Sequence, residues 1–337
     1  MNLDKSSDHS SWIPSSLNDG WIYTEMIRDY HKPKDLLEFL TSNYRHSSKS
    51  KWLGRIRKGE LKVNNLKISN NIKVINGDLI TWCRPPWEEK GVPSSWEVLF
   101  DNEDVLVINK PSGLQTTPGG GFLKHTLTEF LKKEYKLSNN NLIPKPVHRL
   151  GRFTSGVLLC ARKKETRAAL SALFRNECSK QFPFSRIYLG LAKINKSLRI
   201  GESIQVHSAI SRCLHPYLGE VWNITKHNLK ESDQSSQTVS ELRAHTQIKL
   251  IEKRNEADLL ELTIFTGRPH QIRIHLASIG TPLIGDPFYK SGGEILKEST
   301  PGEGGYFLHA QKLLNVPIGE EMYSFEAPTP IKLKLKS

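Results

Sequence analysis

Residues 147–162 read VHRLGRFTSGVLLCAR, and the stretch changes character half way along its length. The first half is polar and rich in turn-forming residues. Its cationic and hydroxyl side chains are His148, Arg149, Arg152, Thr154 and Ser155, and it contains no carboxylate. The second half, VLLCA, is apolar and typical of a buried strand. The stretch therefore predicts a polar loop that leads into a core strand, a common place for functional side chains.

Strands and helices alternate on both sides of this loop. Apolar or alternating runs predict strands at residues 96–100, 105–110, 187–194 and 257–265. Helical spacing of apolar residues predicts helices at residues 126–136, 164–177 and 270–280. Because hairpin-like turns join some strands and helices join others, we expect an α+β fold with a mixed or antiparallel central sheet.

The segment before this region has the pattern of a smaller unit. Residues 34–83 predict two short helices, the second stopped by Gly59, then a strand, a turn at two asparagines and further strands. The second helix and its flanks carry Lys49, Lys51, Arg55, Arg57 and Lys58, which would suit a small RNA-contacting surface. An ordinary exposed basic helix is the alternative. Residues 1–33 are interpreted as a partly ordered arm, 84–95 as a Pro-rich linker and 96–337 as the main domain.

Composition limits the class of protein. The chain has 337 residues, 37% hydrophobic and 25% charged residues, and a net charge of +13, which favours a globular protein with a polyanion such as nucleic acid as its partner. No apolar run is long enough for a membrane helix, and no signal or transit pattern opens the sequence. The four cysteines form no CxxC pair and predict no disulfide framework. We expect an intracellular protein of the cytoplasm or nucleus, and a monomer.

Two further stretches exclude common cofactors. Residues 107–122, VINKPSGLQTTPGGGF, contain glycines but lack both the GxGxxG spacing and the GK[ST] ending of a nucleotide-binding loop. In residues 266–289 the histidines His270 and His275 are five residues apart, the wrong spacing for two metal ligands on one helical face. Arg268 and Arg273 are better used as anchors for a carboxylate or phosphate, and Asp286 is interpreted as structural. These stretches therefore predict neither a nucleotide-binding loop nor a metal site.

Taken in order, the motifs are specific. NKPSGL, VHRL with TSG, RIYLGL, TGRPHQIRIHL with GDPFY, and FLHAQKL follow one another between residues 109 and 313. This series resembles the RluA/RsuA-type pseudouridine synthase family, on its RluA side and in a subgroup with HRLG. The preceding residues 34–83 resemble an S4-type RNA-binding module. The resemblance implies a pseudouridine synthase fold that isomerises uridine in a structured RNA, rRNA or tRNA, without metal or cofactor, after the base is flipped out.

The resemblance also implies roles for individual residues. Arg149 would displace the target base, Tyr188 would stack on uracil, and Arg268 would pair with the catalytic aspartate. The other residues implied in substrate binding are His148, Thr154, Arg186 and Ile272. From the residues alone, a tyrosine in a buried strand such as Tyr188 is more often part of the core, and Thr154 and Ser155 are suited to bonding the loop backbone.

One position departs from the family pattern. The family reads HRLD, and its aspartate is the nucleophile, whereas this chain has Gly151. A glycine offers no covalent catalysis, and the neighbouring acidic residues Glu134 and Glu165 are too far along the chain to substitute simply. Three hypotheses follow: a synthase with a displaced nucleophile or other compensation, a catalytically silent RNA-binding protein, and a scaffold with an incidental basic surface. Retention of Arg149, Tyr188 and Arg268 speaks against the scaffold.

Overall fold

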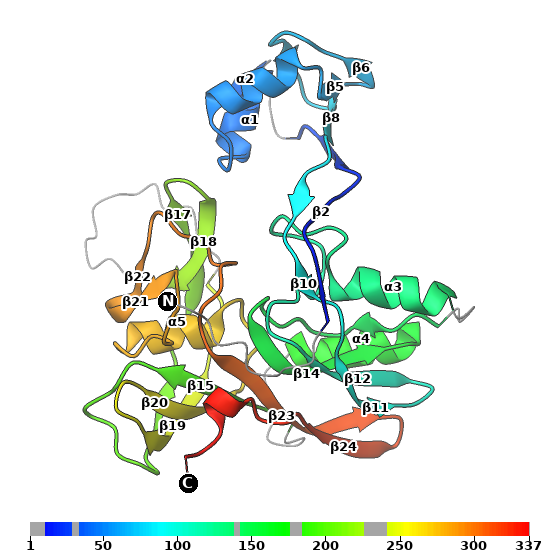
Figure 1. Ribbon diagram of the computed structural model, residues 1–337. Helices are drawn as coiled ribbons and strands as arrows, with labels where there is room; N and C mark the ends of the chain where they lie inside the picture. Colours follow the sequence, from blue (N-terminus) through cyan, green and yellow to red (C-terminus); the bar gives the residue numbers. More distant parts are fainter. Residues whose placement is uncertain (1–10, 29–33, 138–141, 176–183, 226–240, 337) are drawn as a thin grey trace. The chain divides into compact units, whose positions relative to one another are not determined.

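The chain folds into two compact units (Figure 1). The computed structural model describes residues 11–28, 34–137, 142–175, 184–225 and 241–336. The larger unit comprises residues 1–14, 90–213 and 222–337, and the smaller unit comprises residues 15–89 and 214–221.

A ten-stranded mixed sheet forms the centre of the larger unit (Figure 1). Its main path is β11 (Glu97–Asp101), β12 (Val105–Lys110), β14 (Thr154–Ala161), β23 (Leu308–Ile318), β15 (Ser185–Ala192), β20 (Asp258–Ile264), β19 (Thr246–Lys253) and β16 (Ser203–Val206). The strands β13 (Lys145–Pro146) and β24 (Glu321–Glu326) pair with β14 and β23. The pairing of β14 with β23 is parallel, and the other pairings are antiparallel. The expected α+β class with a mixed sheet is confirmed.

Alternation along the strands divides the core between the two faces of the sheet. On β12, Leu106 and Ile108 join one apolar cluster, whereas Val105 and Val107 join another. The helices α3 (Leu127–Leu137) and α5 (Gln271–Ser278) contribute to the first cluster, and α4 (Lys164–Arg175) contributes to the second. All three helices begin within two residues of their predicted starts. Residues 176–177 of the expected second helix lie outside the described residues.

Parallel pairing joins two motifs that are far apart in the sequence. Ser155 lies opposite His309 and Gly156 lies opposite Ala310, and the Ser155 hydroxyl is 2.9 Å from His309 Nδ1. Gly156 has a φ of +108°, and a Cβ atom there would lie 2.1 Å from the carbonyl oxygen of Ala310. Only glycine permits this approach. The TSG and FLHA motifs therefore hold each other in place.

Shorter elements complete the larger unit and its borders. They are β1 (Trp12–Ile13) with β10 (Val92–Pro93), β17 (Ile210–His215) with β18 (Gly219–Ile224), β21 (Tyr289–Lys290) with β22 (Glu294–Ile295), and the 3-10 turns η1 (Ser291–Gly293) and η2 (Ile331–Leu333).

The smaller unit contains the two predicted helices and a four-stranded sheet. The helices are α1 (Leu36–Asn43) and α2 (Lys49–Arg57), and the sheet order is β3 (Trp21–Met26), β8 (Leu79–Arg84), β5 (Leu61–Val63) and β6 (Leu66–Lys67). The short strands β4 (Lys34–Asp35) and β7 (Lys73–Val74) pair beside it. Ser48 caps α2 by accepting a hydrogen bond from the Lys51 N–H, and Asn64 and Asn65 take positive φ values in the β5–β6 turn.

Two segments are more ordered than the sequence suggested. Residues 1–33, expected to be an arm, contain β1, β2 (Ser16–Leu17) and β3, although residues 1–10 and 29–33 lie outside the described residues. The expected linker contains β9 (Glu88–Glu89) and β10, which pair with β2 and β1. A buried hydrogen bond from Asn18 to Glu89, 2.6 Å long, helps to fix this arrangement. Pro and Gly signals mark turns, but they do not reveal partners supplied by a distant segment.

Cys83, Cys160 and Cys213 form no disulfide within the described residues, and Cys178 lies outside them. Over the described ranges, no helix has the length and apolar character that crossing a membrane requires.

Candidate functional site

A buried lysine ties the glycine-containing loop to the VHRLGRFTSG loop. Lys110 is fully buried, and its Nζ donates to the backbone carbonyls of Pro111, Leu114 and Arg152 at 2.8 to 3.2 Å. The three acceptors match the three N–H bonds of an ammonium group. They oppose the effect of burial, which together with the charge of Arg152 lowers the pKa of Lys110 to about 7. The lysine of the NKPSGL motif therefore binds the backbone of the VHRLGRFTSG loop and has no N–H left for a phosphate group.

Replacing Lys110 with methionine should leave these carbonyl groups without a buried donor. We expect Lys110→Met to lower the free energy of unfolding by about 2–3 kcal/mol, since each unsatisfied buried acceptor is costly. Urea unfolding of the purified chain measures this change. The exposed Lys145→Met is the control, and an equal effect in the two variants would show that Lys110 does not brace the loops.

Gly151 has a tyrosine hydroxyl where a side chain would begin. A Cβ atom placed on Gly151 would lie 3.0 Å from the Tyr306 hydroxyl oxygen and 3.3 Å from Thr154 Oγ1. These are the only described heavy atoms within 4 Å of it, apart from those of its chain neighbours. Gly151 is exposed, whereas Tyr306 and Thr154 are buried beside it. Apart from the chain neighbours, the Tyr306 hydroxyl is therefore the described polar group closest to a Cβ atom at position 151.

Arg273 lies over the ring of Tyr306. Its guanidinium carbon is 4.5 Å from the centre of that ring and 4.9 Å from the centre of the Tyr289 ring. Arg273 also forms a buried, bidentate ion pair with Asp286, with N–O distances of 2.6 and 2.8 Å. The second Asp286 oxygen also accepts the N–H groups of Phe288 and Tyr289.

Asp286 therefore has both oxygens engaged and cannot simply replace the missing nucleophile. Burial raises the pKa of this carboxyl, but the hydrogen bonds and charge of Arg273 outweigh burial, and the pKa is lowered overall. Asp286 thus stays ionised as the partner of Arg273. Glu134 and Glu165, the other carboxylates considered from the sequence, are exposed on α3 and α4.

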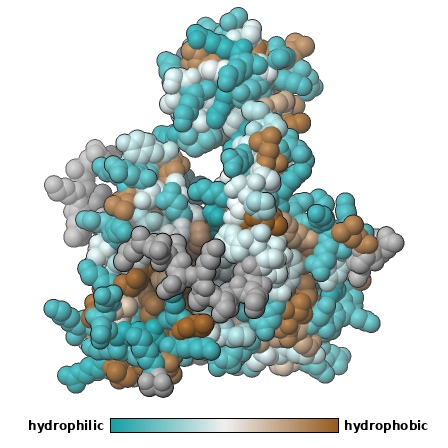
Figure 2. All heavy atoms as spheres, in the orientation of Figure 1, coloured by the Kyte–Doolittle hydropathy of each residue, from teal (hydrophilic) through white to brown (hydrophobic). Residues whose placement is uncertain are grey.

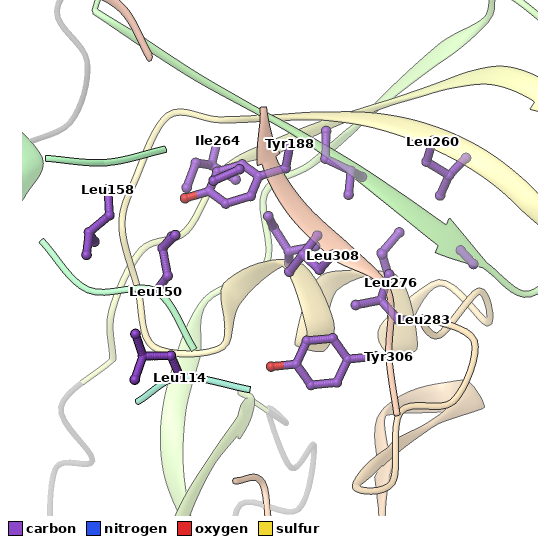
Figure 3. Packing of buried hydrophobic residues seen from close by; sticks show 14 of the residues in the cluster. Leu114, Leu150, Leu158, Tyr188, Leu260, Ile264, Leu276, Leu283, Tyr306 and Leu308 are labelled. Carbon is purple, nitrogen blue, oxygen red and sulfur yellow. The ribbon is translucent and has the colours of Figure 1, made fainter. Parts of the chain in front are cut away.

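Tyr188 and Ile272 line the same apolar cluster as Tyr306. Tyr188 is on β15 and Ile272 is on α5, and both are buried. Figure 3 shows the hydroxyl groups of Tyr188 and Tyr306 directed toward the side of the cluster where Leu150 lies. Burial raises the pKa of Tyr188, although the charge of Arg186 opposes this. Tyr188 therefore keeps its proton at neutral pH and presents a hydroxyl and an aromatic face.

His148 and Arg186 pack beside Phe174. The His148 ring stacks on Phe174 at 4.1 Å, and its Nε2 accepts the Leu159 N–H at 3.1 Å. Burial, and then the charge of Arg186, lower the pKa of His148 to about 3, so the ring is neutral. Arg186 is buried and donates to the Phe174 carbonyl at 3.2 Å. These two residues link α4 to β14 and β15, and their expected role in substrate binding stays a prediction.

Arg268 and Arg149 occupy different surroundings. Arg268 Nε donates to the backbone carbonyl of Arg243 at 2.8 Å, and its backbone N–H donates to Gln271 at 3.0 Å. Arg149 is exposed, and its charge is among those that lower the pKa of His270, after burial and the charge of Arg273. The guanidinium of Arg273 lies over the ring of Tyr306, which neighbours Gly151. From the sequence, Arg273 was predicted only as an anchor for a carboxylate or phosphate.

The basic residues of the smaller unit divide into two groups. Lys49, Lys51, Arg57 and Lys58 are exposed on or next to α2. Arg55 instead packs against both Trp52 and Trp82, with its guanidinium carbon 4.5 and 4.3 Å from the two ring centres.

Sequence reasoning missed Lys110 and Tyr306 as contributors to the site, and it named Arg273 only as an anchor for a carboxylate or phosphate. Tyr306 directly precedes the apolar start of FLHAQKL, and a tyrosine in such a position is usually interpreted as a core residue. No three His, Cys, Asp or Glu side chains come together as a possible metal site within the part of the chain that the structure describes.

Comparison with known proteins identifies the family. The RNA pseudouridylate synthase family profile matches residues 104–278. The chain is 36% identical to an uncharacterised RNA pseudouridine synthase of Synechocystis sp., with 82% of this chain and 88% of the relative covered. It is 30% identical to RNA pseudouridine synthase 5 of Arabidopsis thaliana, with 93% and 94% covered. It shares the fold of human RNA pseudouridylate synthase domain containing 4, with a TM-score of 0.52 at 20% identity over 70% of this chain and 90% of that one. The chain belongs to the RNA pseudouridylate synthase family.

Proposed function

We propose that the chain converts uridine to pseudouridine in a structured rRNA or tRNA, with the Tyr306 hydroxyl at the place of the missing carboxylate. The observation that carries this proposal is the 3.0 Å between that hydroxyl and a Cβ on Gly151. Relatives with ribosomal names support an rRNA target, among them the ribosomal large subunit pseudouridine synthase C of Vibrio parahaemolyticus, which is 28% identical.

The reaction is an isomerisation and needs no external reactant. The bond between C1′ and N1 breaks, uracil turns, and C1′ bonds to C5, which then gives up its hydrogen while N1 carries one. Negative charge develops on uracil as the first bond breaks. A donor fixed beside the reacting atoms stabilises such charge without reorganising. The Tyr306 hydroxyl supplies this hydrogen bond, and Tyr188 contacts the uracil ring.

Arg273 positions Tyr306 in this proposal. The guanidinium over the ring restricts where the hydroxyl can lie, and Asp286 in turn fixes the guanidinium. Arg149 displaces the target base, and the cost of unstacking that base is a few kcal/mol.

We further propose that residues 34–83 form an S4-like RNA-binding module, and that the chain is a member of an HRLG subgroup. The exposed cations Lys49, Lys51, Arg57 and Lys58 support an RNA-contacting face, because neutralising phosphates releases counterions.

Hydrogen loss from C5 provides the direct assay. RNA labelled with tritium at uridine C5 should release tritium when incubated with the purified chain, in step with pseudouridine formation. The alternative function is that of a silent RNA-binding paralogue, which Gly151 favours. RNA bound with no tritium released would support that alternative.

Gly151→Asp tests whether the hydroxyl and a carboxylate compete for one place. The new Cβ must push against Tyr306 and Thr154, so we expect Gly151→Asp alone to be no faster than the unaltered chain. Gly151→Asp with Tyr306→Phe removes the hydroxyl and should be at least about tenfold faster than Tyr306→Phe alone, within the range of positioned groups. Gly151→Ala is the control, because it adds the Cβ atom without a carboxylate. If Gly151→Asp changed the rate by the same factor with and without Tyr306→Phe, the carboxylate and the hydroxyl would not compete for one position.

A further inference from the structure

An exposed aromatic surface lies on the edge strand of the smaller unit. The surface consists of Trp21, Tyr23, His46, Trp82, Arg55 and Arg84. Trp21 is 49% exposed and Tyr23 is 44% exposed, although aromatic rings bury readily. Both are on β3, which pairs with β8 at the edge of the four-stranded sheet. Figure 2 shows apolar side chains among polar ones on the face of this unit that it presents.

Strand register assembles the rings. Tyr23 lies opposite Trp82, and the two rings stack with centroids 5.3 Å apart and an interplanar angle of 21°. Trp21 lies opposite Arg84 in the same register. Trp82 is held in place because its indole N–H donates to Glu60 at 3.1 Å. Odd-numbered residues of a strand share one face, so Trp21 lies on the same face of β3 as Tyr23, which stacks on Trp82.

Cations lie among these rings. Arg55 lies over Trp82 at 4.3 Å, and Arg84 lies over Trp87 at 3.5 Å and over Trp82 at 5.9 Å. The His46 ring stacks on Trp82 at 6.4 Å, and its pKa is lowered by burial and then by the charges of Arg55 and Arg84. Two guanidinium groups therefore lie near Trp82, the half-buried ring on which the exposed Tyr23 stacks.

Rings interleaved with guanidinium groups suit unpaired nucleic acid. Bases stack on aromatic side chains whatever their identity, and arginines attract the phosphates that connect them. Residues 34–83 carry ten Lys and Arg against four Asp and Glu. A protein strand added to the free edge of β3 would need neither the cations nor the stacked rings.

We infer that this aromatic surface binds two or more unpaired bases of single-stranded RNA. The inference rests on RNA as the substrate in the proposed function, but it concerns a binding site of its own and requires no catalysis. It adds β3, outside residues 34–83, to the RNA-contacting part of the chain.

Binding of the full chain to a fluorescein-labelled 12-nucleotide unstructured RNA, and to the same strand in a duplex, tests the inference. Trp21→Ala and Tyr23→Ala should each weaken single-strand binding about tenfold, as expected for one lost stacking contact. Duplex binding should change little, because duplex bases are already stacked. The control is Ile22→Ala, on the opposite face of the same strand and 62% exposed. It should bind as the unaltered chain does.

Three results would overturn the inference. The first is that Tyr23→Ala and Ile22→Ala bind the single strand with equal affinity. The second is that Tyr23→Ala weakens binding to the duplex as much as binding to the single strand. The third is that Tyr23→Ala loses a bound protein partner while its RNA affinity is unchanged. Tritium release is measured on the same preparations. If the unaltered chain releases no tritium but Tyr23→Ala still weakens single-strand binding, the proposed activity is contradicted and the inferred RNA-binding surface is not.

Discussion

Tyr306→Phe should reduce the rate constant for uridine isomerisation at least about a hundredfold while leaving RNA affinity unchanged. Removing one preorganised donor to developing charge costs about 10²–10³ in rate. The phenyl ring would remain beneath Arg273, so packing and the cation–π contact are preserved. Single-turnover tritium release, with enzyme in excess over labelled RNA, measures the chemical step separately from product release.

The control for this variant is Tyr323→Phe, which removes a hydroxyl bonded to Glu321 on β24. It should isomerise uridine at the unaltered rate. A Tyr306→Phe variant that retains full activity would exclude the hydroxyl as the compensating group and would direct attention to Thr154, the other group near the Gly151 position.

Arg273→Met should lower the free energy of unfolding by about 3–5 kcal/mol. The substitution leaves the buried Asp286 carboxylate without its cationic partner, and a buried charge without a partner is expensive. The side chains of Arg273 and Asp286 are 4% and 1% exposed, so water cannot readily replace the pair. Urea unfolding followed by tryptophan fluorescence measures the change.

Two comparisons separate loss of the buried pair from loss of any ion pair. Arg273→Met with Asp286→Asn should be more stable than Arg273→Met alone, because the amide oxygen still accepts the backbone N–H groups and no charge remains. Lys312→Met breaks the surface pair with Glu326 and should cost less than about 1 kcal/mol. Equal effects of Arg273→Met and Lys312→Met would contradict a structural role for the buried pair.

Local patterns predicted the five α-helices that the structure describes and five of the ten strands of the central sheet. The helices α3, α4 and α5 and the strands β12, β14, β15 and β20 followed from the period of their apolar residues. The parallel pairing of β14 with β23 did not, because the two strands are more than 140 residues apart and nothing local specifies the partner. The N-terminal strands β1 to β3 were missed for the same reason, since their partners are β10, β9 and β8.

The roles assigned to the candidate site residues stay predictions, and their contacts could not be predicted from the sequence. Gly151 was identified as the position without a carboxylate, and Tyr188 and Ile272 lie in one cluster with Tyr306. Tyr306 could not be found from the sequence, because its proximity to Gly151 arises from tertiary packing alone. For Arg273, the sequence suggested an anchor for a carboxylate or phosphate, and the structure supplies that carboxylate from Asp286.

Transcriptome-wide mapping of pseudouridine tests most directly whether the chain isomerises uridine despite Gly151. RNA would be compared from cells with the gene, cells without it, and cells without it that are supplied with the unaltered chain or with Tyr306→Phe. We expect a specific pseudouridine in a structured rRNA or tRNA that disappears with the gene, returns with the unaltered chain and does not return with Tyr306→Phe. An identical pseudouridine map in all four samples, with RNA still bound to the chain, would contradict this expectation.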